Sequence, residues 1–335
     1  MIVLGIDTSC DDTSIALLED GKKVLRSLIS SQVDLHRPFG GIVPEIASRK
    51  HVELIDYIYE KILIDTHIKA SDIDGVGVTN GPGLIGSILV GLSFAKGLAL
   101  SLRKPLIPVN HIHAHAMSIF LENEVQFPFI ALVVSGGHTI ILLVKEIFEY
   151  KILGTTRDDA AGEAFDKIAK FLNIGYPGGS IIEEYSKKGI KDYVFFPRPM
   201  INEENYDFSF SGLKTSLINY IKNNIVTNDN LKDILSSFQE AAFDVLTFKT
   251  IKASKDYNIK TIVVGGGVAS NLRLREMFLE KGKKEGIRVF FSSPQFCTDN
   301  GAMIALVAFF GLKRGIPSSL DVKGFSRMPL GELVI

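Results

Sequence analysis

The sequence predicts an α/β protein of two lobes, each built on the same β-β-β-α-β-α unit. The length of 335 residues is enough for two domains that each bury a core. The order of strand-like and helix-like segments recurs in the two halves of the chain. A composition of 46% hydrophobic and 22% charged residues is typical of compact globular enzymes. Folds of this class bind ligands in a cleft between lobes, and we expect such a cleft here.

The first lobe is expected to begin with three strands that form a meander. Short apolar runs separated by a polar loop and a turn indicate these strands at residues 2–6, 14–18 and 24–29. A helix is expected at 45–63, with one apolar face formed by Val52, Ile55, Tyr59 and Ile62. The remaining elements are a strand at 76–79, a glycine-punctuated helix at 84–102 and a strand at 106–109.

The second lobe repeats this order. Strands are expected at 129–134, 139–144, 150–153, 261–264 and 289–292. A helical apolar stripe before the fourth of these strands consists of Leu231, Ile234, Leu235, Phe238, Ala242 and Val245. The predicted lobes are residues 1–125, completed by a C-terminal helix near 300–325, and residues 126–299, with a mixed helix-and-loop insertion at about 157–230.

Composition excludes several classes of protein. Lys and Arg number 37 against 38 for Asp and Glu, so any binding of RNA needs a local patch. The two cysteines form no CxxC pair, which excludes a disulfide framework and a thiolate zinc site. The N-terminus lacks the pattern of a signal peptide, and glycines and a lysine interrupt the apolar stretch 84–102. We therefore expect a cytoplasmic protein that does not enter a membrane.

Three of the seven histidines lie within five residues, at His111, His113 and His115. On a helix that begins there, positions 111 and 115 share one face, and both imidazoles can reach one ion about 2.0–2.1 Å away. Ile112 stands where a zinc-peptidase motif has its catalytic glutamate, so the pair could hold a metal but lacks that base. The alternative interpretation is a polar helix start with surface histidines.

A site with two histidines needs an anionic partner, and Asp299 is the candidate. It lies in the segment 297–301, where the expected strand 289–292 gives way to a helix. Histidine and aspartate ligands without a thiolate suit zinc or ferrous iron, and the spacing does not choose between them. Asp299 could instead cap the helix that begins near Ala302.

Glycine-rich loops recur at strand ends, at residues 80–83, 135–139 and 265–267. Glycine lets backbone N–H groups approach phosphate oxygens closely, but none of these loops matches a Walker or dinucleotide motif, and a plain turn remains the alternative. The polar loop 7–13 has the composition of a phosphate or cation loop. The residues expected to line a phosphate or nucleotide site are Asp7, Ser9, Asp11, Gly265 and Gly266.

Charged residues cluster in four further segments. The segment 158–167 is expected to be helical with Asp159, Glu163 and Asp166 along one face, as a solvated surface or as a site packed against a ligand or partner. Basic residues cluster at 273–275, 281–284 and 313–314. Each basic cluster is more typical of a solvated helix face than of a nucleic-acid site.

Motifs spread along nearly the whole chain form one specific pattern. They are GIDTSCDDT (5–13), GGIVPEIASR (40–49), NHIHAH (110–115), VSGGHT (134–139), DDAAGEAFDK (158–167), YPGG (176–179), FSFSGLKT (208–215), GGGVASN (265–271) and CTDNGAM (297–303). With these motifs the sequence resembles the universal tRNA threonylcarbamoyladenosine transferase subunit, a family once labelled glycoproteases. Asp7 and Asp12 stand where this family more usually has glutamate, and Ser180 where it usually has proline.

The resemblance implies a fold, a reaction and a set of site residues. The fold is the actin-like and Hsp70-like ATPase superfold of two RNase H-like lobes, with an interlobe cleft and a helical insertion in the second half. The reaction moves a threonylcarbamoyl group from threonylcarbamoyl-AMP to the exocyclic amine of the adenosine 3′ to the anticodon, in tRNAs reading ANN codons. The implied catalytic residues and metal ligands are His111, His115 and Asp299. The implied substrate contacts are Val133, Val134, Ser135, Gly136, Gly137, Asp166, Gly179, Glu183 and Asn271.

The same resemblance implies cofactors and partners. The cofactors are one divalent metal, Fe²⁺ or Zn²⁺, and ATP, AMP or threonylcarbamoyl-AMP in the cleft. The partners are tRNA, a shorter paralogous subunit without the metal site, a small P-loop ATPase subunit, and a threonylcarbamoyl-AMP synthase that acts upstream.

Three alternative functions compete with acyl transfer. A nucleotide-binding regulatory module of the Hsp70 type has no evident use for the clustered histidines and Asp299. A metallopeptidase lacks its base, because Ile112 occupies that position. A sugar kinase on the same superfold needs a catalytic carboxylate near a sugar pocket, and no residue of the sequence is selected for that role.

Overall fold

The computed structural model describes residues 1–316 and 319–327, and the chain divides into two compact units. Unit 1 comprises Met1–His36, Ile42–Val125 and the chain from Ser292 onward, and unit 2 comprises Arg37–Gly41 and Gln126–Phe291. The segment 292–299 thus belongs with the first half, where the sequence placed it in the second lobe. The reason is local bonding in unit 1, since the hydroxyls of Ser292 and Ser118 lie 2.8 Å apart.

Unit 1 is built on a five-stranded sheet with the order β3-β2-β1-β4-β5. The strands are β1 (Ile2–Asp7), β2 (Asp12–Glu19), β3 (Lys23–Ser31), β4 (Gly75–Gly81) and β5 (Leu106–Asn110). The first three pair antiparallel, and β4 and β5 continue the sheet in parallel with β1. The predicted meander and the two later strands are confirmed.

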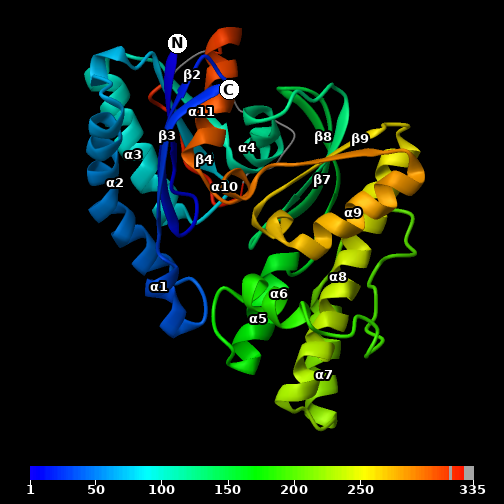
Figure 1. The fold of residues 1–335 in the computed structure, drawn as a ribbon. Coiled ribbons are helices and arrows are strands. Elements are labelled where there is room, and N and C mark those ends of the chain that lie inside the picture. Colours follow the sequence, from blue (N-terminus) through cyan, green and yellow to red (C-terminus); the bar gives the residue numbers. More distant parts are fainter. Residues whose placement is uncertain (317–318, 328–335) are drawn as a thin grey trace. The chain divides into compact units, whose positions relative to one another are not determined.

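Two long helices cover one face of this sheet and lie side by side, in blue and cyan in Figure 1. They are α2 (Pro44–Thr66) and α3 (Ile85–Leu102). The prediction for Val52 was wrong, because this side chain is 63% exposed. The buried residues of α2 are Ala47, His51, Ile55, Ile58 and Ile62. His51 is polar but faces the core, whereas the apolar pattern had placed its neighbour Val52 there.

Helix α3 has the length and apolar composition that a membrane span requires, and 33% of it is buried. It packs against β4 and α2, and Leu92, Ala95 and Ala99 enter the core of unit 1. These contacts are those of a core helix.

The other face of the sheet is covered by α11 (Gly301–Arg314). This helix lies against glycines, because a Cβ at Gly77 would lie 2.5 Å from the Ala308 Cβ. It ends at Arg314 because Gly315, with φ 71°, closes it in the left-handed conformation, so the helix is shorter than the predicted 300–325. The short helices of unit 1 are α1 (Val33–His36), α4 (His111–Met117) and α10 (Pro294–Cys297), with 3₁₀ turns at Ala70–Asp72 and Ser118–Leu121.

Unit 2 has a second five-stranded sheet with the order β10-β9-β6-β7-β8. Its strands are β6 (Phe129–Val134), β7 (Thr139–Glu146), β8 (Glu149–Thr155), β9 (Thr261–Gly265) and β10 (Arg288–Phe291). An antiparallel trio is again extended by two parallel strands, in the order seen in unit 1. The predicted duplication of one α/β unit is confirmed.

The helices of unit 2 pack on and beside this sheet. They are α5 (Ala161–Leu172), α6 (Gly178–Ser186), α7 (Ser211–Asn223), α8 (Asn228–Asp256) and α9 (Leu272–Glu285), with 3₁₀ turns at Arg37–Phe39 and Gly267–Ser270. The predicted apolar stripe of α8 is buried as expected. The insertion supplies α5, α6 and α7, and the ring of Phe165 stacks with that of Phe243 at 5.7 Å between centroids.

Candidate functional site

The histidine pair is placed by the junction of β5 and α4. Asn110 ends the strand, and its side-chain oxygen accepts hydrogen bonds from the N–H groups of Ile112 and His113, at 2.9 and 3.0 Å. This cap starts the helix at His111, so His111 and His115 share one face, with ring centroids 4.6 Å apart. All three histidines of the motif are buried, which excludes the surface interpretation.

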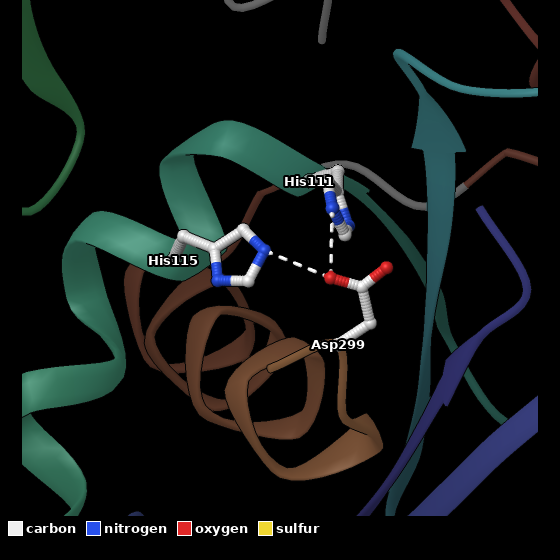
Figure 2. Close-up of side chains that lie close together, drawn as sticks. All are labelled: His111, His115 and Asp299. Atoms are coloured by element: carbon white, nitrogen blue, oxygen red, sulfur yellow. Dashed lines mark hydrogen bonds and ion pairs between the residues drawn. The ribbon is translucent and has the colours of Figure 1, made fainter. Parts of the chain in front are cut away.

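Asp299 meets this pair from the loop before α11. Its Oδ1 lies 3.4 Å from His111 Nε2 and 3.1 Å from His115 Nε2 (Figure 2). The cap of α11 is the neighbouring Asn300, whose side-chain oxygen accepts a hydrogen bond from the N–H of Met303 at 2.9 Å. Asp299 is therefore not the capping residue, and the structure brings together the three residues that the sequence selected as metal ligands.

These three side chains fit a metal ion. Their potential ligand atoms all lie within 4.8 Å of one another. Atoms bound tetrahedrally to one ion at about 2.0–2.1 Å are separated by roughly 3.3 Å, which is close to the two measured N–O distances. Two imidazoles and one carboxylate suit zinc or ferrous iron and leave further coordination positions open to a substrate.

Behind His111 lie Asp7 and Ser9, two residues that the sequence assigned to a phosphate or cation loop. The Asp7 Oδ2 and the Ser9 Oγ are each 3.2 Å from His111 Nδ1. Burial lowers the pKa of His111, but Asp7 and Asp299 outweigh it and raise the pKa to about 10. Without an ion His111 is therefore protonated, and an ion that binds must displace this proton. A carboxylate behind a histidine also fixes its ring for metal binding.

The pKa values of the neighbouring groups are shifted by the same causes, which are burial and nearby charges. Burial lowers the pKa of His115, and the charge on His111 lowers it further. Burial raises the pKa of Asp11 and, with the nearby carboxylates of Asp299 and Asp11, raises the pKa of Asp12 to about 7. An excess of buried carboxylates is the environment in which a cation is stabilised.

His51 is a structural residue of this region that the sequence did not point out. Its Nδ1 lies 2.7 Å from the Thr13 hydroxyl, and its Nε2 lies 3.0 Å from the Cys10 carbonyl. Burial lowers the pKa of His51, so the ring is neutral, with Nε2–H donating to Cys10 and Nδ1 accepting from Thr13. The loop that carries Ser9 and Asp11 is held to α2 in this way. A single histidine in a helix gives no sequence signal for this role.

Asn300 follows Asp299 in the chain and caps α11. Its replacement by alanine is expected to destabilise the protein by about 2 kcal/mol, since the cap and a partly buried hydrogen bond to the Thr298 carbonyl are lost together. Urea unfolding measures this loss. Thr227→Ala removes the exposed cap of α8 and serves as the control, with an expected loss of about 1 kcal/mol. An equal small loss in both variants would contradict the structural role of Asn300.

In unit 2, the loop after β6 lies directly against the start of α5. A Cβ at Gly162 would lie 2.6 Å from the carbonyl oxygen of Ser135, and the Thr139 hydroxyl accepts a hydrogen bond from the Ala161 N–H at 3.0 Å. Val133 and Val134 are buried at the end of β6. A Cβ at Gly136 or Gly137 would meet nothing within 4 Å, so the backbone of this loop is open to a ligand.

Helix α5 begins at Ala161, so the prediction that Asp159 lies on its face was wrong. Asp159 precedes the helix and forms ion pairs with Lys167 and Lys214, each at 2.5 Å. The two lysines neutralise the carboxylate of Asp159. In the predicted helix this carboxylate would instead have lain next to that of Glu163. Lys167 lies in the same segment, but Lys214 is 55 residues away, and periodicity within one segment cannot reveal that contact.

Asp166 and Glu183 each accept a hydrogen bond from an N–H at the start of a helix of unit 2. Asp166 Oδ1 accepts a hydrogen bond from the Gly178 N–H at 2.7 Å, where α6 begins. Glu183 Oε1 accepts one from the Leu272 N–H at 2.8 Å, where α9 begins. A Cβ at Gly179 would meet nothing within 4 Å. Asp166 and Glu183, two of the predicted substrate contacts, therefore hold the starts of α6 and α9. At Gly179, a third predicted contact, the backbone is open to a ligand.

Two further predicted residues of unit 2 are Asn271, at the start of α9, and Gly266, directly after β9. Asn271 caps α9 and donates from its side-chain nitrogen to Gln239 Oε1 at 2.9 Å. Gly266 has φ +92°, and a Cβ there would lie 2.3 Å from the Val134 carbonyl oxygen, so only glycine fits beside β6. Gly265 is the last residue of β9. Open loops and helix N-termini gathered in one unit provide N–H groups for an anionic ligand.

Residues of the three basic clusters form ion pairs or ring contacts within unit 2 and within α11. Arg273 donates to both carboxylate oxygens of Glu240, at 2.9 and 2.6 Å, and Lys281 pairs with Asp244 at 3.1 Å. The Lys313 ammonium lies 5.7 Å from the centre of the Phe309 ring. The prediction of solvated helix faces is wrong for Arg273, whose side chain is 18% exposed, because it packs against Glu240 of α8.

The chain matches the model of one protein family over residues 23–306, and that family is described as tRNA N6-adenosine threonylcarbamoyltransferase. Curated proteins of that name are similar over almost their whole length. The protein from Syntrophus aciditrophicus is 50% identical over 98% of this chain and 98% of its own. The protein from Kosmotoga olearia is 49% identical over 99% of this chain and 100% of its own.

Solved structures with low sequence identity share the fold. Component A of the Acidaminococcus fermentans (R)-2-hydroxyglutaryl-CoA dehydratase matches with a TM-score of 0.56 and 17% identity, over 93% of this chain and 99% of that one. HypF from T. kodakarensis matches with a TM-score of 0.64 and 14% identity, over 94% of this chain and 48% of that one. The predicted actin-like and Hsp70-like superfold is confirmed by these likenesses.

Proposed function

The chain belongs to the tRNA N6-adenosine threonylcarbamoyltransferase family, and on this premise we propose that its donor is threonylcarbamoyl-AMP and its acceptor the adenosine 3′ to the anticodon in tRNAs that read ANN codons. Transfer of a threonylcarbamoyl group to a tRNA adenosine is the activity of this family, and the chain is a transferase. The observation that carries the detailed proposal is the convergence of His111, His115 and Asp299 on one point.

We propose that these three side chains hold one Fe²⁺ or Zn²⁺ ion. Such an ion supplies Lewis acidity, which polarises the carbonyl of the group to be transferred. His111 and His115 bind through Nε2, the atoms that face Asp299. Asp7 orients the ring of His111 from its other nitrogen. The attacking adenine amine displaces AMP, a good leaving group, so positioning of the two reactants contributes more than a strong base.

The open backbone of unit 2 supports binding of the AMP portion of the donor. Gly136, Gly137 and Gly179 have no atom where a Cβ would lie, so N–H groups there can reach a phosphate. A protein of the same fold, the activator of the 2-hydroxyisocaproyl-CoA dehydratase from Clostridium difficile, was solved with bound ADPNP; it matches with a TM-score of 0.52 and 16% identity, over 94% of this chain and 97% of that one. We propose that Asp166, Glu183 and Asn271 act by fixing the helix starts around this ligand.

The competing functions have less support. The side chain of Ile112 is fully buried, so the position of the peptidase glutamate is part of the core. A regulatory nucleotide-binding module does not require the three converging ligands.

We propose that the enzyme works with a shorter paralogous subunit and a small P-loop ATPase subunit, on donor supplied by a threonylcarbamoyl-AMP synthase. Tyr57 and Ile64 are exposed on α2, and we propose them as contacts of unit 1 with a protein partner. A tRNA substrate supports a cytoplasmic location.

The reaction is tested by mixing the chain and its partner subunits with labelled threonylcarbamoyl-AMP and an ANN-reading tRNA transcript. Label is expected on the tRNA, and mapping by nuclease digestion is expected to place it on the adenosine 3′ to the anticodon. A transcript with guanosine at that position is the control. It should remain unlabelled, since guanine carries a carbonyl oxygen at C6, where adenine carries the exocyclic amine. Equal labelling of both transcripts would contradict the proposed acceptor.

A further inference from the structure

A surface hollow of about 460 Å³ lies in unit 2, apart from the glycine loops described above. It is lined by Phe195, Arg198, Ile201, Asn202, Asp244, Phe248 and Lys281. The lining thus combines two aromatic rings, two cations, one carboxylate and one amide. An aromatic hollow with cations at its rim suits a ligand that has a flat ring and a negative charge.

Phe195 is the main aromatic surface of this hollow. Its side chain is 89% exposed, whereas the adjacent Phe196 is 1% exposed and packs edge-on against Phe238. The guanidinium carbon of Arg198 lies 5.2 Å from the centre of the Phe195 ring. One ring of the pair anchors the segment in the core, and the other is presented to solvent with a cation beside it.

The backbone around Phe195 is held firmly to α8. Asp233 accepts a hydrogen bond from the Ile190 N–H at 2.8 Å, and the Ser237 hydroxyl accepts one from the Val194 N–H at 3.1 Å. Arg198 donates to the Phe196 carbonyl at 2.7 Å. A backbone held in this way loses little freedom when a ligand stacks on the ring that it carries.

The surrounding charge is positive. Arg198 and Lys281 both pair with Asp244, at 3.0 and 3.1 Å, so the rim carries one cation more than it has carboxylates. Residues 185–198 contain four basic residues against one acid, and the lysines among them are exposed, although Lys187 pairs with Glu184 just before this range. Exposed aromatic rings lie in the same segment, at Tyr185, Tyr193 and Phe195. Aromatic rings and cations together are typical of surfaces that bind unpaired nucleotides.

We propose that this hollow binds an unpaired nucleobase of the tRNA substrate, which stacks on the Phe195 ring while Arg198 and Lys281 contact its phosphodiester. The proposal rests on the tRNA-modifying function above and adds a second contact with the same substrate, through a base other than the reacting adenosine. An apolar side chain of a partner protein would gain nothing from the excess positive charge, and the rim charge therefore favours RNA.

The proposal is tested by steady-state transfer with the complete complex and Phe195→Ala. Loss of one stacked base is expected to raise the KM for tRNA roughly 5- to 100-fold and to leave kcat within about twofold. Phe195→Tyr, which keeps the ring, should restore the KM. Ile225→Ala is the matched control, because Ile225 is 87% exposed and lies outside the hollow. An unchanged KM in Phe195→Ala overturns the proposal.

A binding measurement separates this inference from the proposed reaction. The chain contains no tryptophan, so Phe195→Trp places a unique fluorophore on the surface of the hollow. Its fluorescence should be quenched by the tRNA transcript or its anticodon stem-loop, and that of Ile225→Trp should not. Quenching without any transfer by the wild type would contradict the reaction but support this site. A response to a partner subunit alone, with none to tRNA, overturns the proposal in favour of a protein interface.

Discussion

Replacing His111 with alanine is expected to lower the rate of threonylcarbamoyl transfer by roughly 10³-fold, because Lewis-acid stabilisation of a developing charge contributes several kcal/mol, and each 1.36 kcal/mol is a factor of ten. The variant loses one of three ligand atoms and leaves the buried carboxylate of Asp7 without its imidazole partner. Metal content per chain, measured by mass spectrometry after dialysis, should fall in parallel with activity.

The control for this variant is His67→Asn. His67 is exposed at the end of α2 with φ 57°, a conformation that asparagine tolerates, and it does not belong to the ligand set. This variant should retain metal and activity. If His111→Ala loses its metal but transfers label at the wild-type rate, the ion has no part in the reaction, and if it keeps both metal and rate, His111 is not a required ligand. Loss of activity with full metal content would assign His111 another role.

The features that the sequence predicts well are those encoded in a short stretch of chain. The strands of both sheets follow from apolar runs bounded by turn residues, and the spacing of His111 and His115 determines that they share a helix face. The pairing of these histidines with Asp299 joins residues far apart in the sequence. The residues alone left Asp299 as a metal ligand or a helix cap, and the family resemblance selected it as a ligand. Local rules are therefore sufficient for the strands and the histidine pair, and the resemblance supplies the third ligand.

Two failures of prediction come from contacts that helical periodicity does not show, whereas the early end of α11 comes from its local cap at Gly315. Val52 is as apolar as a core residue, yet His51 is turned inward because Thr13 and the Cys10 backbone satisfy both of its nitrogens. Asp159 reads as part of a helix until its pairs with Lys167 and Lys214 are known. The exposure of Phe195 follows from burial of Phe196, which two identical neighbouring residues do not reveal.

Substituting Gly5 by alanine is expected to destabilise unit 1 by about 3 kcal/mol and to remove metal binding without touching a ligand. A Cβ at Gly5 would lie 2.1 Å from the Gly301 carbonyl oxygen and 2.3 Å from the Ala305 nitrogen. Both are backbone atoms of α11, so no side-chain rotation relieves the overlap and the helix must shift. Asp299 lies two residues before α11 begins and would move away from the histidines with it.

Thermal unfolding and metal content measure the two consequences together. The midpoint should fall by roughly 6–12 °C, and the metal content of the folded variant should fall as well. Gly97→Ala is the matched control, since a Cβ there meets nothing within 4 Å on the exposed side of α3. It should stabilise the helix by about 0.5–1 kcal/mol and leave the metal bound. A Gly5→Ala protein with unchanged midpoint and full metal content would show that the contact of β1 with α11 does not position Asp299.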